Sequence, residues 1–160
     1  MRITFDVTVA RYVAILEDDP SRIAAMRYCL EQLLARCEHA IFEDASEMIA
    51  WLRVHLGETV LISLDHDLPF FHNIDGSVTD CGTGRQVIDH LCASEVACPV
   101  IVHSSNDPCA QGMVRCLRDA GIVHARVYPH ADTEWVRTAW VETIREYVRA
   151  GRIRGEEPGR

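Results

Sequence analysis

The residues best suited to chemistry stand at the end of an apolar stretch in the middle of the chain. Residues 61–64 read Leu-Ile-Ser-Leu, and Asp65, His66 and Asp67 follow them directly. Such a mostly apolar run predicts a strand that is buried on both faces, as in the middle of a parallel sheet. Ligands bind beyond the carboxyl ends of strands in open α/β sheets, so two carboxylates and an imidazole in this position indicate a site.

Two more clusters of polar side chains follow apolar runs in the same way. The apolar runs are residues 12–16 and 99–102, and both predict buried strands. The side chains that follow them are Glu17, Asp18 and Asp19 after the first run, and His103, Ser104 and Asn106 after the second. If the three strands are neighbours in one parallel sheet, the three clusters meet at one edge.

Clustered carboxylates are the feature that points to a metal. They repel each other and raise each other's pKa unless a cation lies between them. Mg²⁺ prefers oxygen ligands and keeps several waters, so Asp18, Asp65 and one backbone carbonyl would be enough from the protein. We therefore expect a divalent metal, Mg²⁺ in the first place and Mn²⁺ as the alternative. The other interpretation is an acidic edge that only water covers.

Strands and helices that would position these clusters alternate along the chain. Five strand–helix units predict an α/β fold, a flavodoxin-like (βα)5 three-layer sandwich whose parallel sheet has the order 2-1-3-4-5, adopted from fold precedent. The predicted strands are residues 12–16, 40–42, 59–64, 99–102 and 122–128. The predicted helices are residues 22–37 after a Ser21 cap, 44 or 46 to 55, 85–93, 109–120, and 132 or 133 to 149.

The remaining stretches bound the domain. A single domain is expected for residues 1–160, with its core at 12–149. Residues 3–9 alternate apolar and polar side chains and predict an additional edge strand or a loose tail, and residues 151–160 predict a frayed end. Residues 70–83 are polar and long for a connection, so we expect a functional lid or a flexible insertion there.

Composition limits the kinds of binding partner and the cellular location that we expect. The net charge of −8 argues against a basic surface for nucleic acid, and all sixteen basic residues are arginines. No apolar run is long enough for a membrane span or a signal peptide. Seven scattered cysteines without a C-x-x-C pair suit a reducing cytoplasm, which is the expected location.

Three segments resemble response-regulator receiver domains, and the resemblance extends over residues 12–148. The segments read Val-Ala-Ile-Leu-Glu-Asp-Asp-Pro from residue 13, Asp-His-Asp-Leu-Pro from residue 65, and Pro-Val-Ile-Val-His-Ser from residue 99. The resemblance implies that Asp18 binds metal directly, with Glu17 or Asp19 assisting. The further implied roles are a phosphate-contacting or phosphoaccepting carboxylate at Asp65, a metal-binding backbone oxygen at Asp67 and a phosphoryl contact from Ser104.

One receiver feature is missing. Receivers carry a lysine followed by proline at the end of the fifth strand, where it holds the phosphoryl group. This sequence has Tyr128-Pro129 there and contains no lysine. Arg126 and His130 are the nearby candidates for its role, although neither has lysine geometry.

Two motifs are similar to those of a narrower family, the cyclic-phosphate-processing receiver-like proteins. Residues 63–68 read Ser-Leu-Asp-His-Asp-Leu and residues 103–106 read His-Ser-Ser-Asn, where that family has S-L-D-H-D-L and H-S-x-N. Thr83-Gly84 before a helix belongs to the same match. The resemblance implies a metal-dependent site that hydrolyses cyclic phosphates, such as a cyclic nucleotide or a 2′,3′-cyclic RNA end.

Opening a cyclic phosphodiester requires charge neutralisation, an activated water and a proton for the leaving oxygen. The metal would supply the first, and His66 and His103 would serve as base and acid. The expected phosphate-binding residues are Ser104, Asn106 and Thr83. Either histidine could instead only donate a hydrogen bond to a carboxylate. Two other functions stay open: a signalling receiver phosphorylated on Asp65, and a binding module without chemistry.

Overall fold

Five parallel strands form one sheet in the order β2-β1-β3-β6-β7 in the computed structural model, which describes residues 10–153. This order confirms the predicted 2-1-3-4-5 arrangement, because β6 and β7 are the fourth and fifth strands of this sheet along the chain. The strands are β1 (Tyr12–Leu16), β2 (Glu38–Phe42), β3 (Thr59–Leu64), β6 (Val100–His103) and β7 (His124–Val127). The additional strand predicted at residues 3–9 lies outside the described residues.

The central strand, β3, lies between β1 and β6. All six of its residues are buried, as its mostly apolar sequence predicts. Its last residue, Leu64, is in register with Leu16 of β1 and Val102 of β6. The three strands that precede the polar clusters therefore end side by side, and their clusters emerge at one edge of the sheet.

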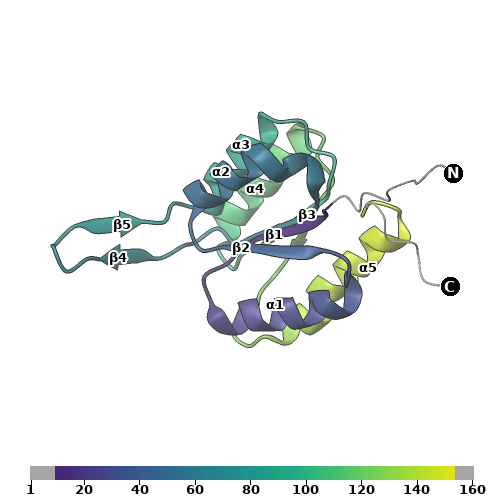
Figure 1. Ribbon diagram of the computed structural model, residues 1–160, viewed down its shortest axis with the longest axis horizontal. Helices are drawn as coiled ribbons and strands as arrows, with labels where there is room; N and C mark the ends of the chain where they lie inside the picture. The colour runs from purple at the N-terminus through teal and green to yellow at the C-terminus, as the bar shows by residue number, and fades with distance from the viewer. Residues whose placement is uncertain (1–9, 154–160) are drawn as a thin grey trace, which may run out of the picture.

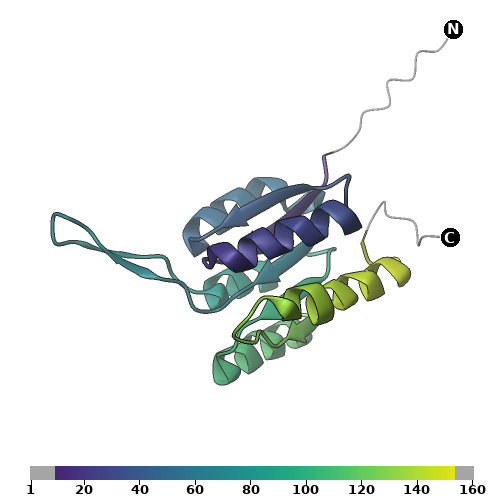
Figure 2. The same ribbon diagram turned by 90° about the horizontal axis from the view of Figure 1, so that it is seen from below.

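Helices cover both faces of the sheet (Figure 1). One face carries α1 and the last helix of the chain, and the opposite face carries α2, α3 and α4 (Figure 2). Their bounds are α1 (Pro20–Leu33), α2 (Ala45–His55), α3 (Gly84–Cys92) and α4 (Asp107–Asp119), with a short 3-10 turn η1 (Leu56–Glu58) before β3. No helix within residues 10–153 is both long and apolar enough to cross a membrane.

The last helix starts with an unusually wide turn. A π-helical segment, η2 (Val136–Trp140), leads directly into α5 (Val141–Arg149). Trp135 and Trp140 are fully buried against the sheet at the two ends of this segment. Such wide turns are rare and are frequent at functional sites.

Two predicted helix boundaries are wrong. Helix α1 is capped by Asp19, whose side chain accepts from the backbone N–H groups of Ser21 and Arg22, and Pro20 takes the first helical position, where a missing N–H costs nothing. The helix also ends at Leu33 rather than at residue 37.

The C-terminal boundary differs as well. At the end of α5, Gly151 adopts a φ of +65°, and the N–H of Arg152 reaches the carbonyl of Tyr147. This turn buries Ile153 in the core, so the predicted frayed end does not begin at residue 151.

The stretch predicted as a lid or flexible insertion forms a β-hairpin. Its strands, β4 (Phe70–His72) and β5 (Val78–Asp80), pair antiparallel and project away from the domain (Figures 1 and 2). Every residue of both strands is exposed. The hairpin therefore adds nothing to the core, and its root is closed where the N–H of Cys81 donates to the carbonyl of Pro69 at 3.4 Å.

Candidate active site

Three carboxylates from two strand ends meet at the edge formed by β1, β3 and β6. Glu17 and Asp18 follow β1, Asp65 follows β3, and each offers an oxygen within 4.8 Å of the other two. Backbone hydrogen bonds continue the sheet beyond the strands, because the N–H of Asp65 donates to the carbonyl of Leu16 at 2.9 Å. The backbone itself thus holds the three side chains together, as the convergence of the strands predicts.

Glu17 is the buried member of this cluster. Its Oε1 accepts from the backbone N–H groups of Asp18 at 3.1 Å and Asp19 at 3.0 Å. Its Oε2 lies 3.2 Å from Nε2 of His103, although the two atoms are not aligned as a hydrogen bond. These contacts fix the position of the Glu17 carboxylate within the cluster.

The pKa values of the three carboxylates are shifted in different directions. Burial raises the pKa of Asp65, and the charge of Glu17 raises it further, although His103 acts in the opposite direction. Burial and the charge of Glu17 likewise raise the pKa of Asp18. Burial would also raise the pKa of Glu17, but His103, the N–H of Asp19 and Arg22 together outweigh it and lower that pKa. The charged form of Glu17 is therefore favoured by its surroundings, whereas the charged forms of Asp18 and Asp65 would be stabilised by a bound cation.

An arginine that the sequence patterns do not single out lies beside these carboxylates. Nη1 of Arg22, in the first turn of α1, is 3.6 Å from Oδ2 of Asp65 and 3.7 Å from Oε2 of Glu17. Its guanidinium lies over the ring of Trp135, 5.7 Å from the ring centre. Asp19 contributes to this placement, because its side chain caps the helix turn that carries Arg22.

The predicted replacements for the missing lysine lie elsewhere. Arg126 pairs with Asp107 and donates to the backbone carbonyl of Ser104 at 3.4 Å. The ring of His130 packs near that of Tyr128, with 5.6 Å between their centres. Within residues 10–153, neither forms an ion pair with a carboxylate of the cluster, and Arg22 is the arginine that does.

His103 is held from below in a network of buried side chains. Its Nδ1 lies 2.8 Å from Oγ of Ser63, and Nε1 of Trp140 donates to that same oxygen at 2.9 Å. If the hydroxyl of Ser63 donates a hydrogen bond to Nδ1 of a neutral imidazole, the ring carries its own proton on Nε2. That nitrogen faces Glu17. No part of the His103 side chain is exposed, so its clearest role is to position Glu17. The motif at residues 63–68 includes Ser63 without giving it a role, and no sequence pattern singles out Trp140.

His66 follows Asp65 and is less deeply buried than His103. Its Nδ1 is 2.7 Å from Oδ1 of Asp67, and the amide of Asn106 donates to both oxygens of Asp67, at 3.3 and 3.2 Å. Asp67 thus orients His66 and Asn106 together, while its own side chain stays outside the carboxylate cluster. The Nε2 of His66 is left as the ring nitrogen that can meet a ligand.

The other predicted phosphate-binding residues line the same edge. Ser104 is buried, and its Oγ accepts from the N–H of Asn106 at 3.2 Å. Thr83 precedes α3 and forms a β-bridge with Asp67. The next residue must be glycine, because a Cβ on Gly84 would lie 1.9 Å from the carbonyl oxygen of Asp65.

The cluster suits a hard divalent cation. Three carboxylates from two strand ends have oxygens within 4.8 Å of one another, and the pKa values of two of them are raised without a cation. Glu17, Asp18 and Asp65 would then be the ligands, with water completing the shell of Mg²⁺. Asp19 caps α1, and its role as an assisting ligand stays a prediction.

Solved structures similar to this one are receiver domains. The phosphorylated cyanobacterial phytochrome response regulator RcpA is 19% identical, the match covers 86% of this chain and 93% of that chain, and the TM-score is 0.64. A response regulator receiver domain from Rhodospirillum rubrum is 17% identical over 91% of this chain and 99% of that chain, with a TM-score of 0.65. The non-phosphorylated receiver domain of RcsB from Escherichia coli is 18% identical over 90% and 96%, with a TM-score of 0.57. At such identities the similarity establishes the receiver-like fold alone.

The family is defined by the sequence. The profile of the cyclic-phosphate processing receiver domain matches residues 13–119, which is more than half of the 160-residue chain. The protein therefore belongs to this family, as its two histidine-containing motifs predict. Comparison with curated proteins gave no match.

Proposed function

We propose that the protein is a metal-dependent phosphoesterase that opens cyclic phosphates, either cyclic nucleotides or 2′,3′-cyclic RNA ends. The main support is the set of three carboxylates, Glu17, Asp18 and Asp65, with oxygens within 4.8 Å of one another at the sheet edge. The description of the family as cyclic-phosphate processing supports the substrate class.

In this proposal each group at the edge has a part in one displacement, in which water forms a bond to phosphorus as a ring P–O bond breaks. A bound divalent metal would neutralise charge on the phosphate and acidify its water. His66, oriented by Asp67, takes the proton from the water or returns it to the leaving oxygen. Arg22 adds positive charge beside Asp65. The residues proposed to donate hydrogen bonds to phosphate oxygens are Ser104, Asn106 and Thr83, and the backbone oxygen of Asp67 remains a proposed metal ligand.

A substrate screen tests the proposal. Cyclic mononucleotides, cyclic oligonucleotides and RNA with a 2′,3′-cyclic end are incubated with the protein and Mg²⁺ or Mn²⁺, and products are followed by ³¹P NMR. We expect a phosphomonoester product from at least one class, and its loss in Asp18→Asn. If no substrate is turned over with either metal, under conditions where the metal binds, the proposed enzymatic activity is refuted.

The two histidines should behave differently when each is replaced by alanine. His66→Ala removes the partly exposed imidazole that pairs with Asp67, so hydrolysis should fall by about a hundredfold or more while metal affinity stays unchanged. His103→Ala empties a buried position between Ser63 and Glu17, so it should lower the free energy of unfolding by about 2–4 kcal/mol. Turnover, calorimetric metal titration and urea denaturation measure the three effects. A His103→Ala protein of normal stability and metal affinity but without activity would give His103 the acid–base role that the sequence predicts.

Phosphorylation of Asp65 is the competing function, and it can be tested on the same protein. In that case Asp65 would attack a phosphoryl donor rather than hold a metal against a cyclic substrate. Incubation with a small acyl phosphate and Mg²⁺, followed by mass spectrometry, should show no lasting adduct. A stable phosphoryl group on Asp65, together with no turnover in the screen, would favour a signalling receiver over the proposed enzyme.

A further inference from the structure

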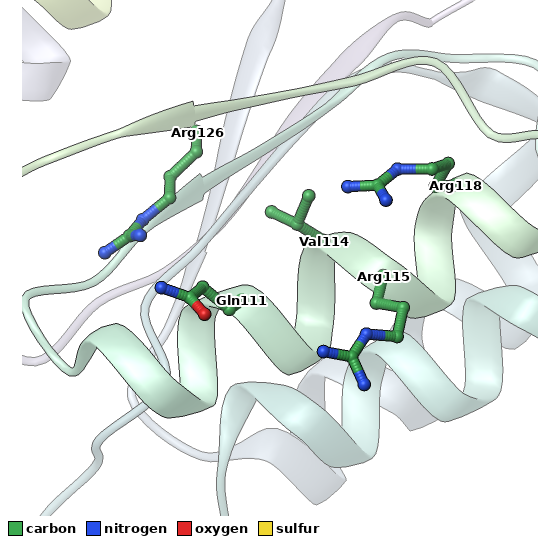
Figure 3. A pocket seen from close by; sticks show the side chains of 5 residues that line it. All are labelled: Gln111, Val114, Arg115, Arg118 and Arg126. Carbon is green, nitrogen blue, oxygen red and sulfur yellow. The ribbon is translucent and has the colours of Figure 1, made fainter.

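A pocket with a volume of about 280 Å³ lies between α4 and β7 (Figure 3), and none of its lining residues belongs to the carboxylate cluster. Three of its five lining residues are arginines. Two of these project from α4 and the third from β7 (Figure 3). The lining residues are Gln111, Val114, Arg115, Arg118 and Arg126. Gln111, Arg115 and Arg118 follow the i, i+4, i+7 spacing and so share one stripe of the helix.

Positive charge at this pocket exceeds the negative charge that pairs with it. Arg126 has an ion-pair partner in Asp107. Arg115 and Arg118 are exposed, and neither forms an ion pair with an acidic side chain in the described part of the chain. In a chain with a net charge of −8, such a group is a local reversal of sign. Guanidinium groups are well suited to phosphate because they can donate two parallel hydrogen bonds to it.

A second observation also points to a ligand. The Nε–H of Arg126 is buried and has no hydrogen-bond partner among the described residues. A buried donor without a partner costs free energy, and an anion that draws the Arg126 side chain into the pocket would supply the missing acceptor. Among the described residues, no aromatic ring lines the pocket, and Val114 is its one apolar lining residue. Charge, rather than stacking on a base, would therefore select the occupant.

We propose that this pocket binds a small phosphorylated anion through its phosphate groups, at a site distinct from the catalytic edge. The volume of about 280 Å³ corresponds to about nine water molecules at roughly 30 Å³ each. One or two phosphate groups fit such a space. The pocket is thus a binding site for a phosphate or diphosphate moiety that carries its charge to Arg115, Arg118 and Arg126.

Arg126 connects this pocket to the catalytic edge. It donates to the carbonyl of Ser104 and pairs with Asp107, the first residue of α4. The preceding residue, Asn106, caps α4 and reaches Asp67. An anion that draws Arg126 away from these partners alters the support of Ser104 and Asn106, so ligands at the two sites change each other's affinity. This coupling rests on the proposed function, whereas binding in the pocket does not.

Calorimetric titration with pyrophosphate, at fixed ionic strength and without divalent metal, tests the pocket. We expect one saturable site on the wild-type protein. The double variant Arg115→Gln/Arg118→Gln should weaken binding by about tenfold or more. The matched control Arg36→Gln/Arg53→Gln removes the same charge from exposed positions on other elements and should bind as the wild type does. All four arginines are exposed, so each variant should keep the wild-type circular dichroism spectrum.

Two results would overturn the proposal. One is the absence of saturable binding to the wild-type protein, and the other is equal binding by the pocket double variant. Arg22→Ala separates the pocket from the proposed function, because it removes the cation beside Asp65 and Glu17 and leaves the pocket intact. Retained pyrophosphate binding in Arg22→Ala supports a separate pocket, and lost binding would place the anion at the carboxylate cluster instead.

Discussion

Arg22 contacts two of the carboxylates that are proposed to bind the metal. Its Nη1 lies 3.6 Å from Asp65 and 3.7 Å from Glu17. Because two cations beside the same anions repel each other, Arg22→Ala should tighten Mg²⁺ binding by about threefold or more. The same change should weaken phosphate binding to the Mg²⁺-loaded protein by about tenfold, since a charged donor is lost. Calorimetric titrations with Mg²⁺ and then with inorganic phosphate measure both.

A matched control separates this effect from a simple change of net charge. Arg27→Ala removes an exposed arginine from the same helix, and both affinities should then stay at their wild-type values. Arg22→Lys, which keeps the charge, should recover most of the phosphate affinity. If Arg22→Ala weakened both ligands equally, the side chain would only support the fold.

Some site residues can be predicted from the sequence and others cannot. Asp65 and Asp18 are predictable, because a carboxylate after a buried strand is conspicuous. Arg22 is not, because an arginine in the first turn of a helix is typical of an ordinary surface position. Recognising Pro20 as the first helical residue would have placed Arg22 next to the strand ends. The burial of His103 depends on the strand face that it occupies, which its position in the sequence leaves open.

Among the larger elements, the start of α3 is fixed by close backbone packing. A Cβ on Gly84 would lie 1.9 Å from the carbonyl oxygen of Asp65 and 3.0 Å from Cε of Met113. Because the nearest atom belongs to the backbone, Gly84→Ala should lower the free energy of unfolding by about 1–3 kcal/mol and displace Asp65. Urea denaturation and Mg²⁺ titration of the variant measure the two consequences.

The same substitution elsewhere should have the opposite sign. Gly112 lies inside α4, and a Cβ there would meet only Nη1 of Arg85, at an ordinary 3.7 Å. Gly112→Ala should therefore raise the free energy of unfolding by about 0.5–1 kcal/mol. Equal effects of the two substitutions would show that the close approach at Gly84 does not constrain the catalytic edge.

The projecting hairpin should be dispensable for stability. Its strands are exposed, and its two ends already meet between Pro69 and Cys81. Replacing residues 70–80 by a short glycine turn should therefore change the free energy of unfolding by no more than about 1 kcal/mol in urea denaturation. A loss of several kcal/mol would mean that the hairpin packs on the domain. Turnover by this variant shows whether the hairpin acts as the lid that the sequence predicts.

Element order was predictable because apolar strands and amphipathic helices alternate clearly from residue 12 onwards. The hairpin was not, because the two short strands at residues 70–72 and 78–80 lack a buried face and so lack the alternation that marks a strand. The π-helical turn at Val136–Trp140 was also missed, because its residues read as an ordinary helix.

At the scale of the whole molecule, protons should compete with the proposed metal for the carboxylate cluster. The pKa values of Asp18 and Asp65 are raised, mainly by burial. Without metal, their contribution to stability is present at low pH and is lost as pH rises through the folded-state pKa values. Metal binds the deprotonated carboxylates, so the sign reverses when it is present. The increase in Tm caused by Mg²⁺ should therefore grow as pH rises from about 4 to about 7.

Thermal unfolding in Mg²⁺ and in EDTA, at several pH values, measures this difference. Asp65→Asn should lose most of the Mg²⁺-dependent increase in Tm at every pH. An increase that is constant across the pH range, or that persists in the variant, would show that the cluster does not bind the ion.

The wide turn at the start of the last helix also gives the protein an internal optical probe. Trp135 stacks on His103 at 5.7 Å between ring centres and lies beneath Arg22, and Trp140 is buried in the same network. Indole fluorescence responds to nearby charge, so a ligand that moves Arg22 should change the emission. The third tryptophan, Trp51, lies on α2. In Trp51→Phe, all remaining tryptophan emission would come from Trp135 and Trp140, beneath the carboxylate cluster, and binding could be followed without a label.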